Sequence, residues 1–128
     1  MVSEVIIDTN FFMAVFQFKI DVIDELKKVV PSCKLTTPKF VISELEGLKT
    51  NKNQNIRKQA TMALRIAKSY DVEIMYVSTL KGESVDDALL RISKSKILAT
   101  NDGLLKKRAK EASIRVAYIR QKRYIAID

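Results

Sequence analysis

Short apolar runs alternate along the chain with longer segments whose apolar residues recur every three or four positions. Val5-Ile6-Ile7 is an uninterrupted apolar run, which is typical of a parallel strand covered on both faces. Further short runs predict strands at residues 34–36, 72–77, 97–99 and 116–119, with an edge piece at 124–127. The intervening segments predict helices around residues 20–30, 38–48, 53–70, 84–92 and 102–112.

This alternation predicts an α/β fold, a three-layer α/β/α sandwich with a mostly parallel central sheet. A length of 128 residues suits a single domain over residues 1–128. A hydrophobic fraction of 47% and a charged fraction of 30% are typical of a globular chain rather than a disordered one. No apolar run approaches the roughly 18 residues that span a bilayer, and the N-terminus lacks a signal-like stretch.

The absence of histidine and the presence of one cysteine restrict the chemistry of this chain. Cys33 has no second cysteine with which to form an internal disulfide, which favours a reducing, cytoplasmic location. Zinc fingers, Ser-His-Asp triads and Cys-His nucleophiles are excluded because their side chains are missing. Any catalysis must therefore use carboxylates, hydroxyls, amines and metal ions.

The positive charge is concentrated at one end of the sequence. Residues 1–90 hold 12 basic and 12 acidic side chains, whereas residues 91–128 hold 11 basic and 3 acidic, so the net charge of +8 comes from the second segment. Such an asymmetry favours a polyanionic partner on one side of the domain, although a solvated helix face would have the same composition. The candidate RNA contacts are Lys106, Lys107, Arg108, Lys110, Arg120, Lys122 and Arg123.

Acidic residues follow or approach the ends of the predicted strands. Asp8 follows the first strand and Asp102 the fourth. Asp86 and Asp87 begin the helix after the third strand, and Glu44 lies in the second turn of the helix after the second. In an open parallel sheet these positions meet at the carboxyl edge, where ligands bind. The sequence therefore predicts one acidic pocket drawn from four segments.

Several of these acids also have a structural explanation. Asp8 has the position of a helix cap, Asp87 follows Ser84 at the spacing of a capping box, and Asp102 is a favourable first-turn anion. Glu44 lies beyond the first turn, on the border of an apolar stripe, and is expected to be partly buried. A buried carboxylate needs a partner or a cation.

A hard divalent cation would relieve the repulsion among clustered carboxylates. Ligand sets made only of oxygen, without imidazole or thiolate, favour Mg²⁺ or Mn²⁺. An acidic metal pocket beside a basic flank is an arrangement suited to phosphodiester cleavage.

At these residues the chain resembles the PIN-domain ribonucleases. The segments that carry the resemblance, in the order of that family's four acidic motifs, are Val5-Ile6-Ile7-Asp8-Thr9-Asn10, Val41-Ile42-Ser43-Glu44-Leu45, Asp87-Ala88-Leu89-Leu90 and Ala99-Thr100-Asn101-Asp102. The resemblance implies that Asp8, Glu44, Asp87 and Asp102 form the catalytic, metal-binding quartet. It also implies that Asp86 is a further acid of a double-Asp signature, and that Asn10 and Thr100 help to position the ligands.

Other segments are similar to the Fcf-like branch of that superfamily: Glu44-Leu45-Glu46-Gly47-Leu48, Ala63-Leu64-Arg65-Ile66-Ala67-Lys68, Lys81-Gly82-Glu83-Ser84-Val85-Asp86-Asp87 and Ile119-Arg120-Gln121-Lys122-Arg123-Tyr124. This likeness implies a Mg²⁺- or Mn²⁺-dependent endoribonuclease of ribosomal RNA processing. VapC-type toxins share the quartet and are the main alternative; they imply an antitoxin partner and a homodimer. An inactive RNA-binding PIN scaffold is a third reading, and the retention of all four acids argues against it.

Overall fold

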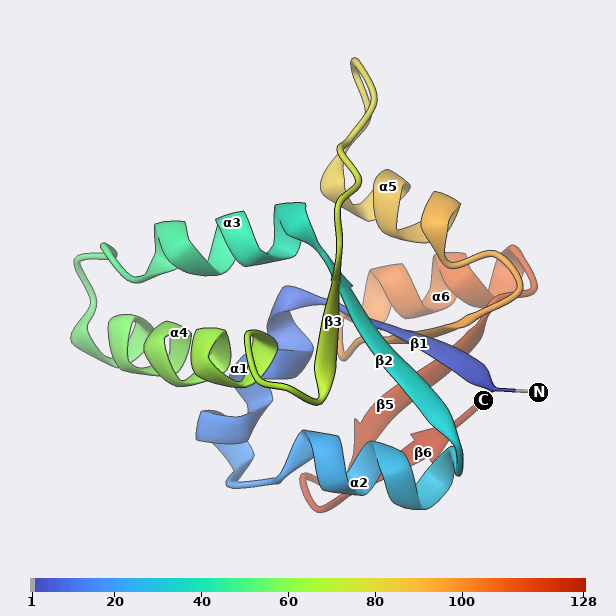
Figure 1. Ribbon diagram of the computed structural model, residues 1–128, viewed down its shortest axis with the longest axis horizontal. Helices are drawn as coiled ribbons and strands as arrows, with labels where there is room; N and C mark the ends of the chain where they lie inside the picture. Colours follow the sequence, from blue (N-terminus) through green and yellow to red (C-terminus); the bar gives the residue numbers. More distant parts are fainter. Residues whose placement is uncertain (1) are drawn as a thin grey trace.

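The computed structural model describes residues 2–128 and contains a six-stranded sheet flanked by helices (Figure 1). The strands are β1 (Ser3–Ile7), β2 (Cys33–Pro38), β3 (Val72–Met75), β4 (Ile97–Ala99), β5 (Arg115–Arg120) and β6 (Tyr124–Ile127). The helices are α1 (Thr9–Phe18), α2 (Val22–Val29), α3 (Lys39–Leu48), α4 (Gln54–Ala67), α5 (Val85–Ile92) and α6 (Gly103–Glu111). Within residues 2–128, no helix is long and apolar enough to span a membrane.

The order of the strands places β1 inside the sheet. The order is β3-β2-β1-β4-β5-β6, with all pairs parallel except β5 and β6. Val5 of β1 is in register with Leu35 of β2 on one side and Ile97 of β4 on the other. The carboxyl ends of these three strands therefore lie at one edge of the sheet, as the sequence predicts.

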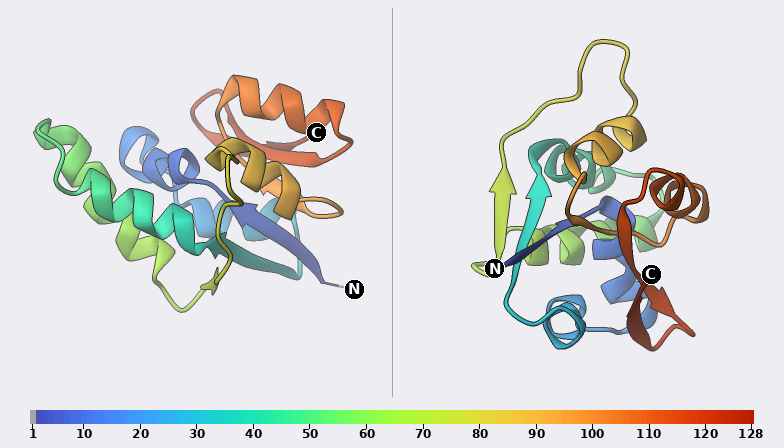
Figure 2. Two further views of the ribbon diagram at one scale, coloured as in Figure 1. Left: turned by 90° about the horizontal axis from the view of Figure 1, so that it is seen from above. Right: turned by 90° about the vertical axis from the view of Figure 1, so that its right-hand side faces the viewer.

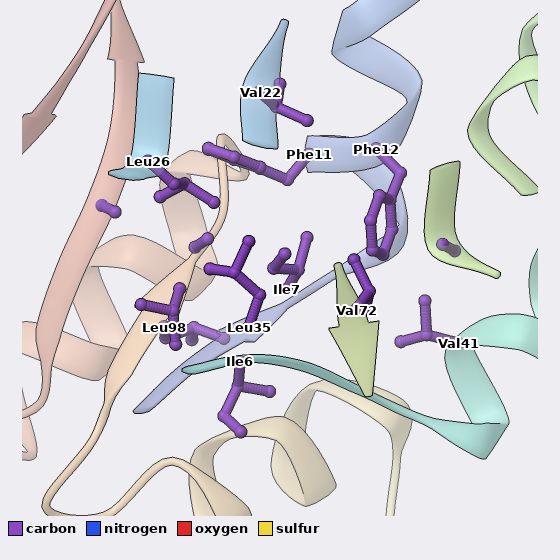
Figure 3. Packing of buried hydrophobic residues seen from close by; sticks show 14 of the residues in the cluster. Ile6, Ile7, Phe11, Phe12, Val22, Leu26, Leu35, Val41, Val72 and Leu98 are labelled. Atoms are coloured by element: carbon purple, nitrogen blue, oxygen red, sulfur yellow. The ribbon is translucent and has the colours of Figure 1, made fainter. Parts of the chain in front are cut away.

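Helices cover both faces of the sheet (Figure 2). Helices α1, α2 and α4 lie on one face, and α5 and α6 lie on the other. Ile6 and Ile7, both fully buried, point to opposite faces because successive strand residues alternate (Figure 3). Ile7 lies on the side of Phe11 and Phe12 of α1. The predicted three-layer α/β/α architecture is confirmed.

One helix was not predicted from the sequence. The expected helix around residues 20–30 is preceded by a separate helix, α1, and Lys19 ends α1 in the left-handed conformation with φ of 55°. Residues 11–16 are all apolar, so they show no helical period. Phe11 and Phe12 are nevertheless fully buried against the sheet, and this burial determines how α1 packs.

The start of α3 also differs from expectation. Pro38 is the N-cap and the last residue of β2, rather than the first residue of the helix. The Thr37 hydroxyl donates to the carbonyl oxygen of Ile7 at 2.9 Å. This bond ties the end of β2 to the end of β1, next to Asp8.

Candidate functional site

Four carboxylates line one hollow at the carboxyl edge of the sheet. The hollow has a volume of about 320 Å³, and its acidic residues are Asp8, Glu44, Asp86 and Asp102. We call it the acidic hollow; its remaining walls are Thr9, Asn10, Leu48, Val85 and Leu89. Its four acids come from the end of β1, from α3, from α5 and from the turn after β4. The structure thus brings together acids that lie far apart in the sequence.

Asp8 is the most buried of the four, with 4% of its surface exposed. It is the N-cap of α1: Oδ1 accepts a hydrogen bond from the backbone N–H of Phe11 at 2.9 Å. Burial raises the pKa of Asp8 to about 7, and the negative charges of Asp102 and Glu44 act in the same direction, against hydrogen bonds from Thr100 and Phe11. Capping thus explains the hydrogen bond to one carboxylate oxygen of Asp8, but it does not offset the free-energy cost of burying a negative charge.

Thr100 connects two of the acids. It is fully buried, and its hydroxyl donates to Asp8 Oδ2 while accepting a hydrogen bond from the backbone N–H of Asp102 at 3.1 Å. Asp102 in turn caps α6, where its Oδ1 accepts from the N–H of Leu105 at 2.8 Å. Thr100 therefore contacts the carboxylate of Asp8 and the backbone of Asp102, as expected for the positioning role that the family resemblance implies.

Glu44 reaches the acidic hollow from an exposed position, so the prediction that it is partly buried is wrong. The buried face of α3 is formed by Val41, Ile42 and Leu45. Ile42 belongs to that buried face. The centre of the face therefore lies further around the helix from Glu44 than the centre of the apolar stripe predicted from the sequence. The side chain of Glu44 can move at the rim, unlike that of Asp8.

The two adjacent aspartates of α5 face different surroundings. Asp86 lines the acidic hollow, where burial and the charges of Asp102 and Asp87 raise its pKa, opposed by Arg108. Asp87 lies outside the hollow, and its Oδ1 accepts a hydrogen bond from Arg108 at 2.5 Å. Arg108, with a smaller effect of Ser84, lowers the pKa of Asp87. Asp86 therefore occupies the hollow in place of Asp87, contrary to the expectation from the motif.

Asp87 also has the structural role that its spacing predicted. Its backbone N–H donates to Ser84 Oγ at 3.0 Å, and Ser84 is the N-cap of α5. This contact is half of a capping box.

The residues of the acidic hollow fit a hard divalent cation in type. Their donors are carboxylate oxygens, and the buried charge of Asp8 has no cationic partner among its hydrogen bonds. With the side chains as they lie in residues 2–128, no three acidic or cysteine residues converge closely enough to hold one ion. Binding would require the side chain of Glu44 or Asp86 to turn inward, and Glu44 is exposed and free to do so.

The seven predicted basic residues divide into two groups. Arg108 is paired with Asp87, and Lys110 lies 2.5 Å from Asp128. Lys107, Arg120, Lys122 and Arg123 are exposed, and Lys106 lies with its ammonium 3.8 Å from the centre of the Tyr118 ring. Arg108 and Lys110 are therefore occupied within the protein, and the other five are available to an anionic partner.

Comparisons with known proteins agree with this fold. An open, mostly parallel sheet with an acidic hollow at its carboxyl edge defines a class of α/β proteins. A family model described as a PIN like domain matches residues 5–122, and the chain therefore belongs to that family. This confirms the resemblance at the level of the family; the comparisons do not single out the Fcf-like branch.

Two curated relatives match along nearly the whole chain. Ribonuclease VapC4 of Methanocaldococcus jannaschii is 27% identical over 128 residues, covering 97% of this chain and 95% of the relative. Ribonuclease VapC9 of Archaeoglobus fulgidus is 30% identical over 126 residues, covering 96% and 87%. Among solved structures, the PIN domain endonuclease Utp24 is similar with a TM-score of 0.80 and 30% identity, covering 98% of this chain and 90% of that one.

Proposed function

We propose that this protein is an endoribonuclease that hydrolyses RNA phosphodiester bonds with Mg²⁺ or Mn²⁺. The observation that carries the proposal is that Asp8, Glu44, Asp86 and Asp102 line one hollow, with Asp8 buried. The ribonuclease and endonuclease names of the relatives support the same activity.

The same four residues would hold the cation, with Asp86 in place of Asp87. When bound, such a cation offsets phosphate charge and lowers the pKa of attacking water. Thr100 orients the carboxylate of Asp8 and holds the backbone of Asp102 beside it. The exposed basic residues attract the RNA backbone through charge.

The substrate we propose is a ribosomal RNA precursor. The Fcf-like segments named above support it. The likeness to the endonuclease Utp24 over 98% of this chain supports the cleavage activity itself. The second candidate is a toxin ribonuclease, paired with an antitoxin and acting as a homodimer. It is favoured by the VapC names of the two curated relatives.

Single-turnover cleavage of a structured RNA tests the activity. The wild type with Mn²⁺ should cut the RNA, and it should fail to do so with a chelator. Asp8→Asn, purified in parallel, should lose cleavage while keeping the circular dichroism spectrum of the wild type. Cleavage that survives both the chelator and Asp8→Asn would contradict the proposal.

Crosslinking in the source cells separates the two substrates. Crosslinked ribosomal precursors favour the first candidate. Transfer RNA together with a co-purifying small protein favours the second. Crosslinks to neither class would contradict both.

A further inference from the structure

A second hollow adjoins the acidic one. It has a volume of about 380 Å³ and shares Asn10 and Asp102 with the acidic hollow. We call it the adjoining hollow. Its volume lies within the range of sites that bind small ligands. Any molecule that occupies both hollows must pass Asn10 and Asp102.

The charge of the adjoining hollow is opposite to that of its neighbour. Lys106 from α6 and Lys122 from the turn between β5 and β6 line it. The ammonium of Lys106 lies 3.8 Å from the centre of the Tyr118 ring, and this cation–π contact restrains an otherwise flexible side chain. One positive charge is thus held in place before any ligand binds.

Lys122 is placed by the backbone. Gln121 and Lys122 both have positive φ, 54° and 55°, which is the conformation of a tight hairpin turn. The turn joins β5 to the antiparallel β6. The position of Lys122 therefore follows from the hairpin, although its side chain is exposed.

The polar side chains of the adjoining hollow are suited to hydrogen bonds with the edge of an RNA base. Asn101 Oδ1 accepts a hydrogen bond from the backbone N–H of Ile119 at 2.7 Å, which leaves its amide N–H₂ as a donor. Asn10 is exposed at the boundary between the two hollows. Phe18 and Ile119 add apolar surface. Amides beside aromatic and apolar side chains are typical of sites for unpaired bases.

We infer that the adjoining hollow binds one nucleotide of single-stranded RNA, next to the phosphate that enters the acidic hollow. This inference rests on the proposed function. Lys106 and Lys122 contact the phosphate of that nucleotide, and Asn10 and Asn101 contact its base. A base in a duplex has its edge paired, so the hollow selects unpaired RNA beside the cleaved bond.

Binding without cleavage tests the inference. The probe is a fluorescent single-stranded RNA heptamer, titrated in a chelator at several salt concentrations. Each phosphate contact adds about 0.7 to the slope of log affinity against log salt for a single strand. Because both lysines contact one phosphate, Lys106→Gln with Lys122→Gln should lower the slope by about 0.7. Lys34→Gln with Lys94→Gln is the matched control at the amino edge of the sheet, and it should leave the slope unchanged.

A second measurement addresses the base. The heptamer with 4-thiouridine at one position is photocrosslinked, and the attached peptides are mapped. Crosslinks to residues 101–106 or 118–122 support the inference, and Asn101→Ala should reduce them. Crosslinks confined to other surfaces, or a salt slope that responds equally to both lysine pairs, would overturn it.

The experiments distinguish the proposed ribonuclease activity from the nucleotide site in the adjoining hollow. A protein that cleaves RNA with Mn²⁺ but shows neither effect overturns the adjoining hollow alone. A protein that shows both effects but never cleaves RNA overturns the proposed function and leaves the nucleotide site. A protein that binds no RNA overturns both.

Discussion

The guanidinium of Arg108 on α6 lies 2.5 Å from a carboxylate oxygen of Asp87 on α5. This ion pair holds the side chain of Asp87 towards α6. Neighbouring residues in a helix point about 100° apart, so the side chains of Asp86 and Asp87 leave α5 in different directions. With Asp87 turned to Arg108, Asp86 is directed into the hollow.

Replacing each aspartate of this pair in turn tests the assignment. Asp86→Asn removes a carboxylate from the acidic hollow and should lower single-turnover cleavage with Mn²⁺ on the order of 100-fold or more. Asp87→Asn has the same change of charge outside the hollow, and it should cleave at a rate close to that of the wild type. Equal loss in both variants, or loss only in Asp87→Asn, would restore Asp87 to the site.

Metal binding should raise the melting temperature of the wild type. A ligand at about 100 times its dissociation constant stabilises the native state by about 2.7 kcal/mol. Differential scanning fluorimetry with Mn²⁺, Mg²⁺ and a chelator measures the shift. Asp8→Asn should reduce the shift strongly, and Asp87→Asn should retain it. A wild type whose melting temperature ignores both ions up to millimolar concentrations would contradict a cation site.

Asp8 makes the stability of the metal-free protein depend on pH. Its pKa is about 7 in the folded state because of burial, against an ordinary value of 3.8. Between these values the folded state holds a proton that the unfolded state has lost, so the free energy of unfolding falls as pH rises from about 4 to about 7.

Urea denaturation in a chelator at several pH values measures this slope. One such group contributes up to about 1.4 kcal/mol for each pH unit. Asp8→Asn, which cannot titrate, should show a flatter profile. An identical slope in the wild type and in Asp8→Asn would show that Asp8 does not carry the raised pKa.

Thr100→Val removes the hydroxyl that connects Asp8 to Asp102. The loss of a buried hydroxyl that both donates and accepts should cost about 1–3 kcal/mol of unfolding free energy. It should also weaken Mn²⁺ binding by about 10–100-fold, since Asp8 loses the partner that orients it. Calorimetric titration with Mn²⁺ measures that affinity.

Thr36→Val is the matched control for this experiment. Thr36 is also buried, and its hydroxyl donates to the carbonyl oxygen of Val5 at 3.2 Å, away from the acidic hollow. It should lose stability in a similar way and keep the Mn²⁺ affinity of the wild type. If both variants lose Mn²⁺ affinity equally, Thr100→Val acts by lowering the stability of the fold and not by releasing Asp8.

The sheet and two of the site residues could be predicted from the sequence. The continuous apolar run of Val5 to Ile7 indicates a strand covered on both faces, and an acid directly after such a strand must lie at the carboxyl edge of the sheet. This rule alone predicts that Asp8 and Asp102 lie at that edge. The placement of Thr100 came from the resemblance to a family rather than from spacing.

Other features depend on tertiary packing that no local pattern encodes. The choice between Asp86 and Asp87 depends on how α5 is rotated against Arg108 of another helix. The exposure of Glu44 depends on Ile42 being part of the buried face of α3. The adjoining hollow joins side chains from Asn10 to Lys122, which become neighbours only once the sheet has formed.

The position of β4 between β1 and β5 has a consequence for the chain during its synthesis. Asp102 leaves the ribosome 94 residues after Asp8, and β4 must pair with β1 before the two acids can line one hollow. A nascent chain that ends before β4 has the first acids of the site without the last. The full set of four carboxylates is therefore assembled only after β4 has been synthesised and has paired with β1.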